Sequence, residues 1–372
     1  MADTSIGGVF EAAGFQRLDT PILQPADVFL DRSGDAIRRR LYMLTDPGGR
    51  EHCLRPELTI PLARAVIEAG ETTARVWSTG LVFRYGGPSR GPSGGQGGGE
   101  FTQVGLEHLG GRDAVTDDAE IFALIDTACG LDGACDVRLG DLGVFQGVLN
   151  AVDLPAVWRA RLRRHFWHAE VFQDLLARLK GERKIRGDEN AGLLASIGVL
   201  SPVEATRAVH DILKLANIRP VGGRTVEEIT ARFLEKAQDA SNEVVAPGVV
   251  KALEAFLRLE TTAKDAAGEL SKLAAKFGLD LGVALNRLEA RHTALAARGL
   301  KLGAAHFATA FGRELEYYTG FVFELHAGGH KIAGGGRYDG LMEQLGAPQP
   351  ITAVGGAIWP ARLPKPAKGG AR

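Results

Sequence analysis

Two runs of alternating apolar and polar residues, joined by a glycine-rich segment, limit the possible folds more than any other feature of this sequence. Residues 75–85 and 100–110 both show the two-residue period of a half-buried strand, and the second run places Gln103 and Glu107 on the same face. The joining segment, residues 86–99, holds eight glycines in fourteen residues. Such a segment can cradle phosphate, but here no helix and no Lys-Ser or Lys-Thr pair follows it. The pattern therefore predicts an antiparallel hairpin with a disordered tip.

The composition argues against several classes of function. The chain has 372 residues, a formal net charge of -1 and 24% charged residues, so its overall charge offers no attraction to nucleic acid or to an anionic membrane. Three cysteines, with neither metal-ligand spacing nor an even count, favour a reducing compartment. The sequence shows no targeting pattern at its start and no apolar run of membrane-spanning length. We expect a soluble cytoplasmic protein of two or three domains.

The first part of the chain mixes strands and helices. Residues 41–46 and 135–140 have the composition of strands, and residues 113–129 predict an amphipathic helix opened by acidic side chains. Residues 61–69 predict another helix, with Thr59 as its N-terminal cap. Strands and helices that alternate in this irregular order favour a mixed α and β domain.

From residue 146 to about residue 296 the sequence changes to helical segments broken by glycine and proline. Several arginines and lysines between residues 159 and 186 form a basic face. A basic face can contact RNA or an acidic partner, but solvated helix surface is the favoured interpretation. This part of the chain is expected to form a second region.

The densest group of polar and aromatic side chains lies near the C-terminal end. Arg-Glu-Leu-Glu-Tyr-Tyr-Thr-Gly at residues 313–320 precedes a strand-like run, and Gly-Gly-Gly-Arg-Tyr-Asp-Gly follows at residues 334–340. Glycines let the backbone approach a ligand closely, so these segments predict a small-molecule pocket. The alternative is a buried hairpin with a surface turn, because paired tyrosines in strands often only pack.

Five segments, in the same order along the chain, resemble the core of the class II histidyl-tRNA synthetases. They are Leu-Arg-Pro-Glu-Leu-Thr at 54–59, Val-Phe-Arg-Tyr at 82–85, Glu-Phe-Thr-Gln at 100–103 followed by Glu107, Arg-Glu-Leu-Glu-Tyr-Tyr at 313–318, and Gly-Gly-Arg-Tyr-Asp-Gly at 335–340. The resemblance implies an α+β fold, in which a class II aminoacyl-tRNA synthetase-like antiparallel sheet is flanked by helices and carries a helical insertion. It also implies a homodimer formed through the segment around Pro21.

This resemblance divides the chain into expected domains. The ranges are 1–145 for the first half of the synthetase-like core, 146–298 for the helical insertion, 299–363 for the second half of the core, and 364–372 for a disordered tail.

The resemblance also implies a histidine pocket. Glu57, Thr59 and Gln103 would bind the amino group, Arg84 would face the carboxylate, and Glu107 and Tyr318 would hold the imidazole. This chemistry suits a zwitterion, which needs acceptors for its ammonium group and a cation for its carboxylate. Arg313 stabilises phosphate charge in a synthetase, and here it would either do so or pair with a carboxylate such as Glu316 or Glu324. The expected histidine-binding residues are Glu57, Thr59, Arg84, Gln103, Glu107, Arg313, Tyr317 and Tyr318.

Departures from the synthetase pattern are as informative as the matches. After Phe-Arg-Tyr, a synthetase supplies further arginines to the ATP triphosphate, whereas this chain has Gly86, Gly87 and Pro88. Residues 353–363 resemble the third class II motif, but Trp359 stands where a glycine lets adenine lie, and Ala361 replaces a glutamate. Phosphoryl chemistry depends on preorganised positive charge and on magnesium held by carboxylates. We therefore expect no catalytic residue, no metal ion and no cofactor.

A synthetase-like core with a histidine pocket, an eroded ATP site and no anticodon-binding domain resembles the regulatory subunits of ATP phosphoribosyltransferase. That family implies a short catalytic subunit as partner, a hetero-oligomer, allosteric feedback by histidine in histidine biosynthesis, and no tRNA or membrane partner. One alternative is a truncated synthetase-like enzyme that forms an aminoacyl-adenylate or acylates a non-standard acceptor, using Arg84, Arg313 and Arg362. A kinase-regulatory synthetase-like domain is a further alternative, and it fits less well.

Overall fold

The structure, a computed structural model, describes residues 2–30, 40–86, 99–131, 135–181, 196–197, 200–216, 226, 229–230, 234, 245–311 and 317–364. The chain divides into two compact units, one formed by residues 1–152 and 251–372 and the other by residues 153–250. A compact unit and an inserted domain need not share borders. The ranges 1–145, 146–298 and 299–363 therefore stay a prediction, and the expected tail lies almost wholly outside the described residues.

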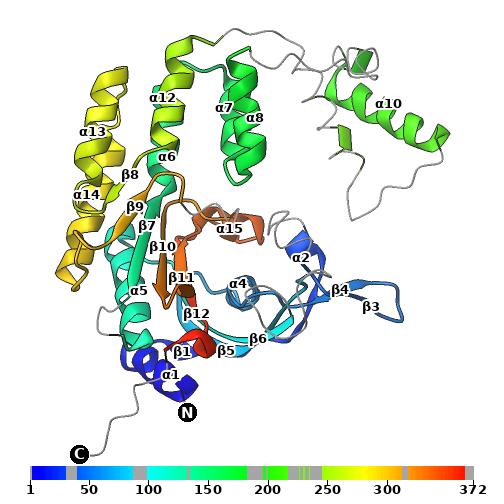
Figure 1. Cartoon of the computed structure of the whole chain (residues 1–372). Coiled ribbons are helices and arrows are strands. Elements are labelled where there is room, and N and C mark those ends of the chain that lie inside the picture. The colour runs from blue at the N-terminus through cyan, green and yellow to red at the C-terminus, as the bar shows by residue number, and fades with distance from the viewer. Residues whose placement is uncertain are drawn as a thin grey trace, which may run out of the picture. The chain divides into compact units, whose positions relative to one another are not determined.

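A nine-stranded sheet organises the first unit (Figure 1). Its strands, in spatial order, are β1 (Gln16–Arg17), β5 (Ala74–Arg84), β6 (Gly99–Leu109), β12 (Ala353–Ile358), β11 (His330–Arg337), β10 (Phe321–Ala327), β7 (Asp136–Asp141), β9 (His306–Ala308) and β8 (Glu260–Thr262). The six strands from β5 to β7 pair antiparallel throughout. Strand β1 pairs with β5 in parallel, β9 pairs with β7 in parallel, and β8 pairs with β9 antiparallel. The antiparallel centre brings segments far apart in sequence into one surface.

The predicted hairpin forms the strongest pairing of this sheet. Strands β5 and β6 stay in register from Ala74 opposite Leu109 to Arg84 opposite Gly99. Continuous pairing over this length fixes which side chains share a face, because neighbouring residues point to opposite faces. Gln103 and Glu107 therefore point to the same side of the sheet, as the sequence predicts. Residues 87–98 of the expected tip lie outside the described part of the chain.

Helices cover both faces of the sheet. The helices of the first unit are α1 (Ala2–Ala12), α2 (Asp27–Leu30), α4 (Thr59–Glu68), α5 (Ala114–Cys129), α6 (Leu142–Ala151), α13 (Ala266–Phe277), α14 (Gly282–Ala297), α15 (Asp339–Gln344) and the short η1 (Pro360–Arg362). Helix α5 packs on β6, β10, β11 and β12, with Phe122 edge-on to Phe323 at 5.3 Å between ring centroids. Helix α4 packs against β5 and β6, where Leu58 and Leu62 lie over Gly105. The arrangement is the antiparallel sheet flanked by helices that the sequence predicts.

A second, smaller sheet lies beside α4 and consists of β2 (Leu23–Pro25), β4 (Glu51–Leu54) and β3 (Met43–Thr45). Arg55 follows β4 and ties this sheet to the large one, because its guanidinium donates to the carbonyls of Thr20 (2.6 Å) and Leu81 (2.8 Å). The Leu-Arg-Pro-Glu segment at residues 54–57 therefore supports the fold through Arg55 as well as the pocket through Glu57.

The N-terminus of α4 differs in one respect from the sequence-based expectation. Thr59 is not the cap: the helix begins at Thr59, and the Glu57 carboxylate accepts hydrogen bonds from the backbone N–H groups of Thr59 and Ile60, both at 2.8 Å. A carboxylate at this position satisfies free N–H groups and matches the positive end of the helix dipole. The hydroxyl of Thr59 is thereby available for another contact.

A buried ion network joins the sheet to the helices on its α5 side. Arg291 of α14 is 1% exposed and donates to Asp118 of α5 at 2.7 Å and to Asp141 at the end of β7. Arg337 of β11 donates to the other oxygen of Asp118 at 2.9 Å. Removal of one member would leave a buried charge without its partner, so the network fixes how these elements pack.

The second unit is helical where it is described. It contains α7 (Ala156–His165), α8 (Ala169–Leu179) and α10 (Pro202–Leu215), and α12 (Pro247–Leu257) begins in it and ends in the first unit. Helix α10 opens with a capping box between Ser201 and Glu204. Arg161, one of the arginines of the basic face, is buried against Trp158 at 5.2 Å from the ring. That arginine packs rather than reaching outward.

Candidate functional site

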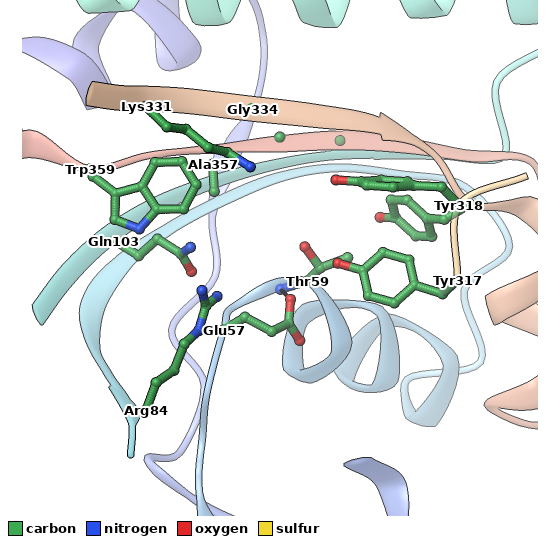
Figure 2. Close-up of a pocket in the computed structure, with 13 residues that line it drawn as sticks. Glu57, Thr59, Arg84, Gln103, Tyr317, Tyr318, Lys331, Gly334, Ala357 and Trp359 are labelled. Atoms are coloured by element: carbon green, nitrogen blue, oxygen red, sulfur yellow. Dashed lines mark hydrogen bonds between the residues drawn. The ribbon is translucent and has the colours of Figure 1, made fainter. Parts of the chain in front are cut away.

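A pocket lies on the α4 side of the large sheet (Figure 2). Six of the eight residues expected from the sequence line it: Glu57, Thr59, Arg84, Gln103, Tyr317 and Tyr318. The other lining residues are Lys331, Gly334, Tyr338, Gly355, Gly356, Ala357 and Trp359. Its free volume is about 70 Å³, which is room for several water molecules and therefore for a small polar ligand.

Glycines leave the surface of the sheet beneath this pocket free of side chains. Gly355 of β12 lies opposite Glu107 of β6, and a Cβ atom on Gly355 would overlap the Glu107 carboxylate. Side chains at these positions would fill the space that the ligand needs. Gly334, Gly355 and Gly356 therefore form part of the pocket floor.

Opposite charges meet at the base of the pocket. Glu57 is 4% exposed, and burial raises the pKa of its carboxyl, while the helix N–H groups and Arg84 act in the opposite direction. Arg84 donates through Nε to the Pro56 carbonyl at 2.8 Å, which holds the rest of the guanidinium toward the pocket (Figure 2). Burial lowers the pKa of Arg84, and Glu57 opposes that shift. A zwitterion suits this pair because it brings one charge to each.

Glu107 lies just behind the lining residues rather than among them. It is fully buried, and it accepts hydrogen bonds from the hydroxyls of Thr59, at 2.6 Å, and Tyr338. Burial raises the pKa of the Glu107 carboxyl to about 8, even though both hydroxyls favour its charged form. Glu107 is therefore mostly protonated at neutral pH, and it positions two pocket hydroxyls.

Tyrosine rings form the far end of the pocket (Figure 2). The ring of Tyr317 meets those of Tyr318 and Tyr338 edge-on, with centroids 5.1 Å and 5.9 Å apart. Burial raises the pKa of Tyr317 and Tyr338 well above the usual value, so both hydroxyls stay protonated and can donate or accept. Flat aromatic walls with hydroxyl groups suit a small aromatic ring such as imidazole.

Seven lining residues were not in the expected set, and three of them have large side chains: Lys331, Tyr338 and Trp359. Tyr338 belongs to the Gly-Gly-Arg-Tyr-Asp segment, and its position one residue after the strand end was the available signal. Trp359 was expected only as an obstruction. Of the other two expected residues, Glu107 supports the pocket from behind, and Arg313 lies outside the described residues.

The described residues form neither a metal-binding cluster nor a membrane-spanning helix. No group of three or more histidine, cysteine, aspartate or glutamate side chains in this part of the chain is placed to hold a metal ion. Nor does any helix there have both the length and the apolar character needed to cross a bilayer.

Comparisons with known proteins show which family the chain resembles. A family model described as histidyl-tRNA synthetase matches residues 2–214 and 214–363. A relative from Mesorhizobium japonicum, named ATP phosphoribosyltransferase regulatory subunit, is 37% identical over 370 residues, which cover 96% of this chain and 95% of the relative. A relative of the same name from Brucella anthropi is 36% identical over 383 residues, which cover 98% of each chain.

A solved structure, described as an ATP phosphoribosyltransferase regulatory subunit/histidyl-tRNA synthetase from Bacillus halodurans C, has a TM-score of 0.62 and 19% identity. The match covers 98% of this chain and 78% of that chain. This likeness confirms the class II synthetase-like fold predicted from the sequence. The curated relatives and the matched family model show that the chain belongs to the family of ATP phosphoribosyltransferase regulatory subunits, with a histidyl-tRNA synthetase-like core.

Proposed function

We propose that this chain is a non-catalytic regulatory subunit that senses free histidine for a short ATP phosphoribosyltransferase catalytic subunit. It would act in the cytoplasm, in histidine biosynthesis, and would both activate the catalytic subunit and inhibit it when histidine binds. The observation that carries this proposal is a pocket of amino-acid size that keeps complementary groups for histidine at both ends.

The pocket groups suit the three polar parts of histidine. Glu57 and the Gln103 amide oxygen are acceptors for the ammonium group, and Arg84 is the cation for the carboxylate. Tyr317 and Tyr318 offer hydroxyls and ring faces to the imidazole at the other end, supported by Glu107. Arg313 stays in the proposed set on the resemblance alone.

Feedback requires histidine to bind one state of the complex more tightly than another, because a ligand with equal affinity for both shifts nothing. The test is calorimetric titration of the purified subunit with histidine, followed by histidine inhibition of the reconstituted complex. Glu107→Ala should weaken both responses, since it removes the carboxyl group that accepts from the Thr59 and Tyr338 hydroxyls and positions them. Unchanged binding and inhibition in this variant would argue for a histidine site elsewhere, such as the subunit interface.

We further propose a homodimer within the hetero-oligomer. The small sheet exposes several apolar side chains close to Pro21: Ile22, Leu23, Tyr42, Met43 and Leu44, each between 36% and 49% exposed. An apolar patch of this kind is typical of a protein interface. Sedimentation analysis should give a dimer for the native chain and a monomer for a Leu23→Asp, Met43→Asp variant, whereas a dimer in both cases would exclude this surface.

A second candidate, an enzyme that forms an aminoacyl-adenylate, has some support from Arg84 in the pocket and from Arg362, whose charge acts on it. Histidine-dependent exchange of labelled pyrophosphate into ATP separates the two functions. We expect no exchange by the purified chain, and exchange would favour the enzyme.

A further inference from the structure

Two buried polar atoms in the pocket have no hydrogen-bond partner among the described residues. They are the indole nitrogen Nε1 of Trp359 and the amide oxygen Oε1 of Gln103, whose side chains are 8% and 2% exposed. A buried polar atom left without a partner is unfavourable, because it has lost its hydrogen bonds to water and gained none in return. Both residues line the pocket, so a ligand there could satisfy both atoms.

The two atoms have complementary polarity. The indole N–H only donates, whereas the amide oxygen only accepts. An α-amino acid carries an acceptor group, the carboxylate, and a donor group, the ammonium, on the same carbon atom. Figure 2 shows the indole nitrogen turned toward the Gln103 amide, with the Arg84 guanidinium close by. One donor and one acceptor are thus presented side by side, where such a ligand needs them.

The position of the Trp359 ring is fixed by its surroundings. Its backbone N–H donates to the Ile332 carbonyl at 2.9 Å, which anchors it to β11. Lys331 Nζ lies 5.4 Å from the ring centroid and Arg362 Cζ lies 5.2 Å from it. The Arg362 guanidinium also donates to the Lys331 carbonyl at 3.2 Å. A donor held in this way loses little freedom when a ligand binds.

Positive charge dominates this end of the pocket. Arg84 and Lys331 line it, and Arg362 lies against Trp359. Two carboxylates oppose them: Glu57 near Arg84, and Glu324, which pairs with Lys331. The surplus of positive charge favours an anionic group at the indole N–H over a neutral one.

From these observations we propose that the indole N–H of Trp359 donates to the α-carboxylate of bound histidine, alongside Arg84, while Gln103 accepts from the ammonium group. Trp359 would thus provide a carboxylate-binding group at the position where a synthetase binds its nucleotide. The proposal rests on the proposed histidine-sensing function and makes Trp359 a specificity residue for it. The subunit would bind histidine that has a free carboxylate, and it would bind analogues without that charge more weakly.

The experiment compares two tryptophan variants by calorimetric titration with L-histidine. Trp359→Phe removes the indole N–H and keeps an aromatic ring. Trp77→Phe is the matched control, because Trp77 is also buried with an unpartnered Nε1 atom among the described residues, but it does not line the pocket. Trp359→Phe should weaken histidine binding about 10- to 100-fold, the range for a hydrogen bond to a charged group, and Trp77→Phe should leave it within about twofold.

A second ligand identifies the group that Trp359 contacts. Histidinamide keeps the imidazole and the ammonium group but has a neutral amide in place of the carboxylate. Because hydrogen bonds to neutral acceptors are weaker, the native preference for histidine over histidinamide should fall about 5- to 10-fold in Trp359→Phe. The thermal unfolding of both variants, measured without ligand, shows whether either substitution disturbs the fold.

The results separate the inference from the function on which it rests. If the native chain binds no histidine, the proposed function fails and the inference with it. If the native chain binds histidine and Trp359→Phe binds it equally well, only the inference is overturned. An equal loss of affinity for histidine and histidinamide would also overturn it, because such a loss reports ring packing rather than a contact with the carboxylate.

Discussion

Replacement of Glu107 by glutamine should change how the stability of the first unit depends on pH. Glu107 is fully buried, and two hydroxyl groups, those of Thr59 and Tyr338, donate to it. No cation pairs with it among the described residues, and burial raises its pKa from the usual 4.5 to about 8. Glutamine has nearly the same shape and no titrating proton, so the Glu107→Gln variant isolates this one group.

The sign of the effect follows from proton binding. Between about pH 4.5 and about pH 8 the unfolded chain has lost the Glu107 proton while the folded chain keeps it. The folded state therefore binds more protons, and its stability falls as the pH rises through this window. At about 1.4 kcal/mol per pKa unit the whole window is worth about 5 kcal/mol. From about pH 5.5 to about pH 7.5 the native chain should lose about 3 kcal/mol relative to the variant.

Urea unfolding followed by tryptophan fluorescence measures this difference. The two compact units need not unfold together, so the signal must come from the first unit alone. Trp158 and Trp167 belong to the second unit, and Trp77 and Trp359 belong to the first. Both proteins should therefore carry Trp158→Phe and Trp167→Phe, which leaves reporters only in the unit that holds Glu107.

Comparison of the two proteins at each pH cancels the titration of other groups, such as Glu57, whose pKa is also raised by burial. The stability advantage of the glutamine variant should grow steadily with pH and level off above about pH 8. An advantage that stays constant within about 0.5 kcal/mol across this range would refute the reasoning, since it would mean that Glu107 ionises in the folded state at its usual pKa.

Three further substitutions test the site and its support. Gly355→Ala should destabilise the first unit by about 3 kcal/mol in thermal unfolding, because the added Cβ would overlap the buried Glu107 carboxylate. Arg291→Met should cost about 3–5 kcal/mol in urea unfolding, since Asp118 keeps Arg337 but the buried Asp141 loses the arginine that pairs with it. Tyr318→Phe should raise the histidine concentration for half-inhibition of the complex about 3- to 10-fold with unchanged circular dichroism, whereas an unchanged response would leave Tyr318 a packing residue.

The hairpin of β5 and β6 could be predicted from local pattern, whereas the pocket residues were expected from the resemblance to a known family. The alternation of apolar and polar residues in β5 and β6 predicts on which face of the sheet the Gln103 side chain lies. Burial of that face then fixes the register of the hairpin, because a shift by one residue would turn every side chain to the other face. The pairing of β6 with β12 and of β12 with β11 involves segments about 250 residues apart or joined by a helix, which local pattern does not encode. There the resemblance to a known family supplied the order of the pieces.

Details that depend on competition between side chains were not predictable from pattern. Thr59 has the usual composition of a helix cap, but Glu57 occupies the helix N–H groups and leaves the Thr59 hydroxyl to Glu107. Trp359 gave a similar result. Its size indicated an obstruction, but whether its N–H would find a partner depends on where Lys331 and Arg362 hold the ring.

Arg337 and Tyr338 show most clearly why a sequence motif is not yet a site. The two are neighbours in the Gly-Gly-Arg-Tyr-Asp segment, and both are buried. Neighbouring residues at a strand point to opposite faces. Accordingly Tyr338 reaches Glu107 on the pocket side, while Arg337 reaches Asp118 in the ion network on the α5 side. One motif thus serves both the binding of a ligand and the packing of the sheet, and only the geometry separates the two roles.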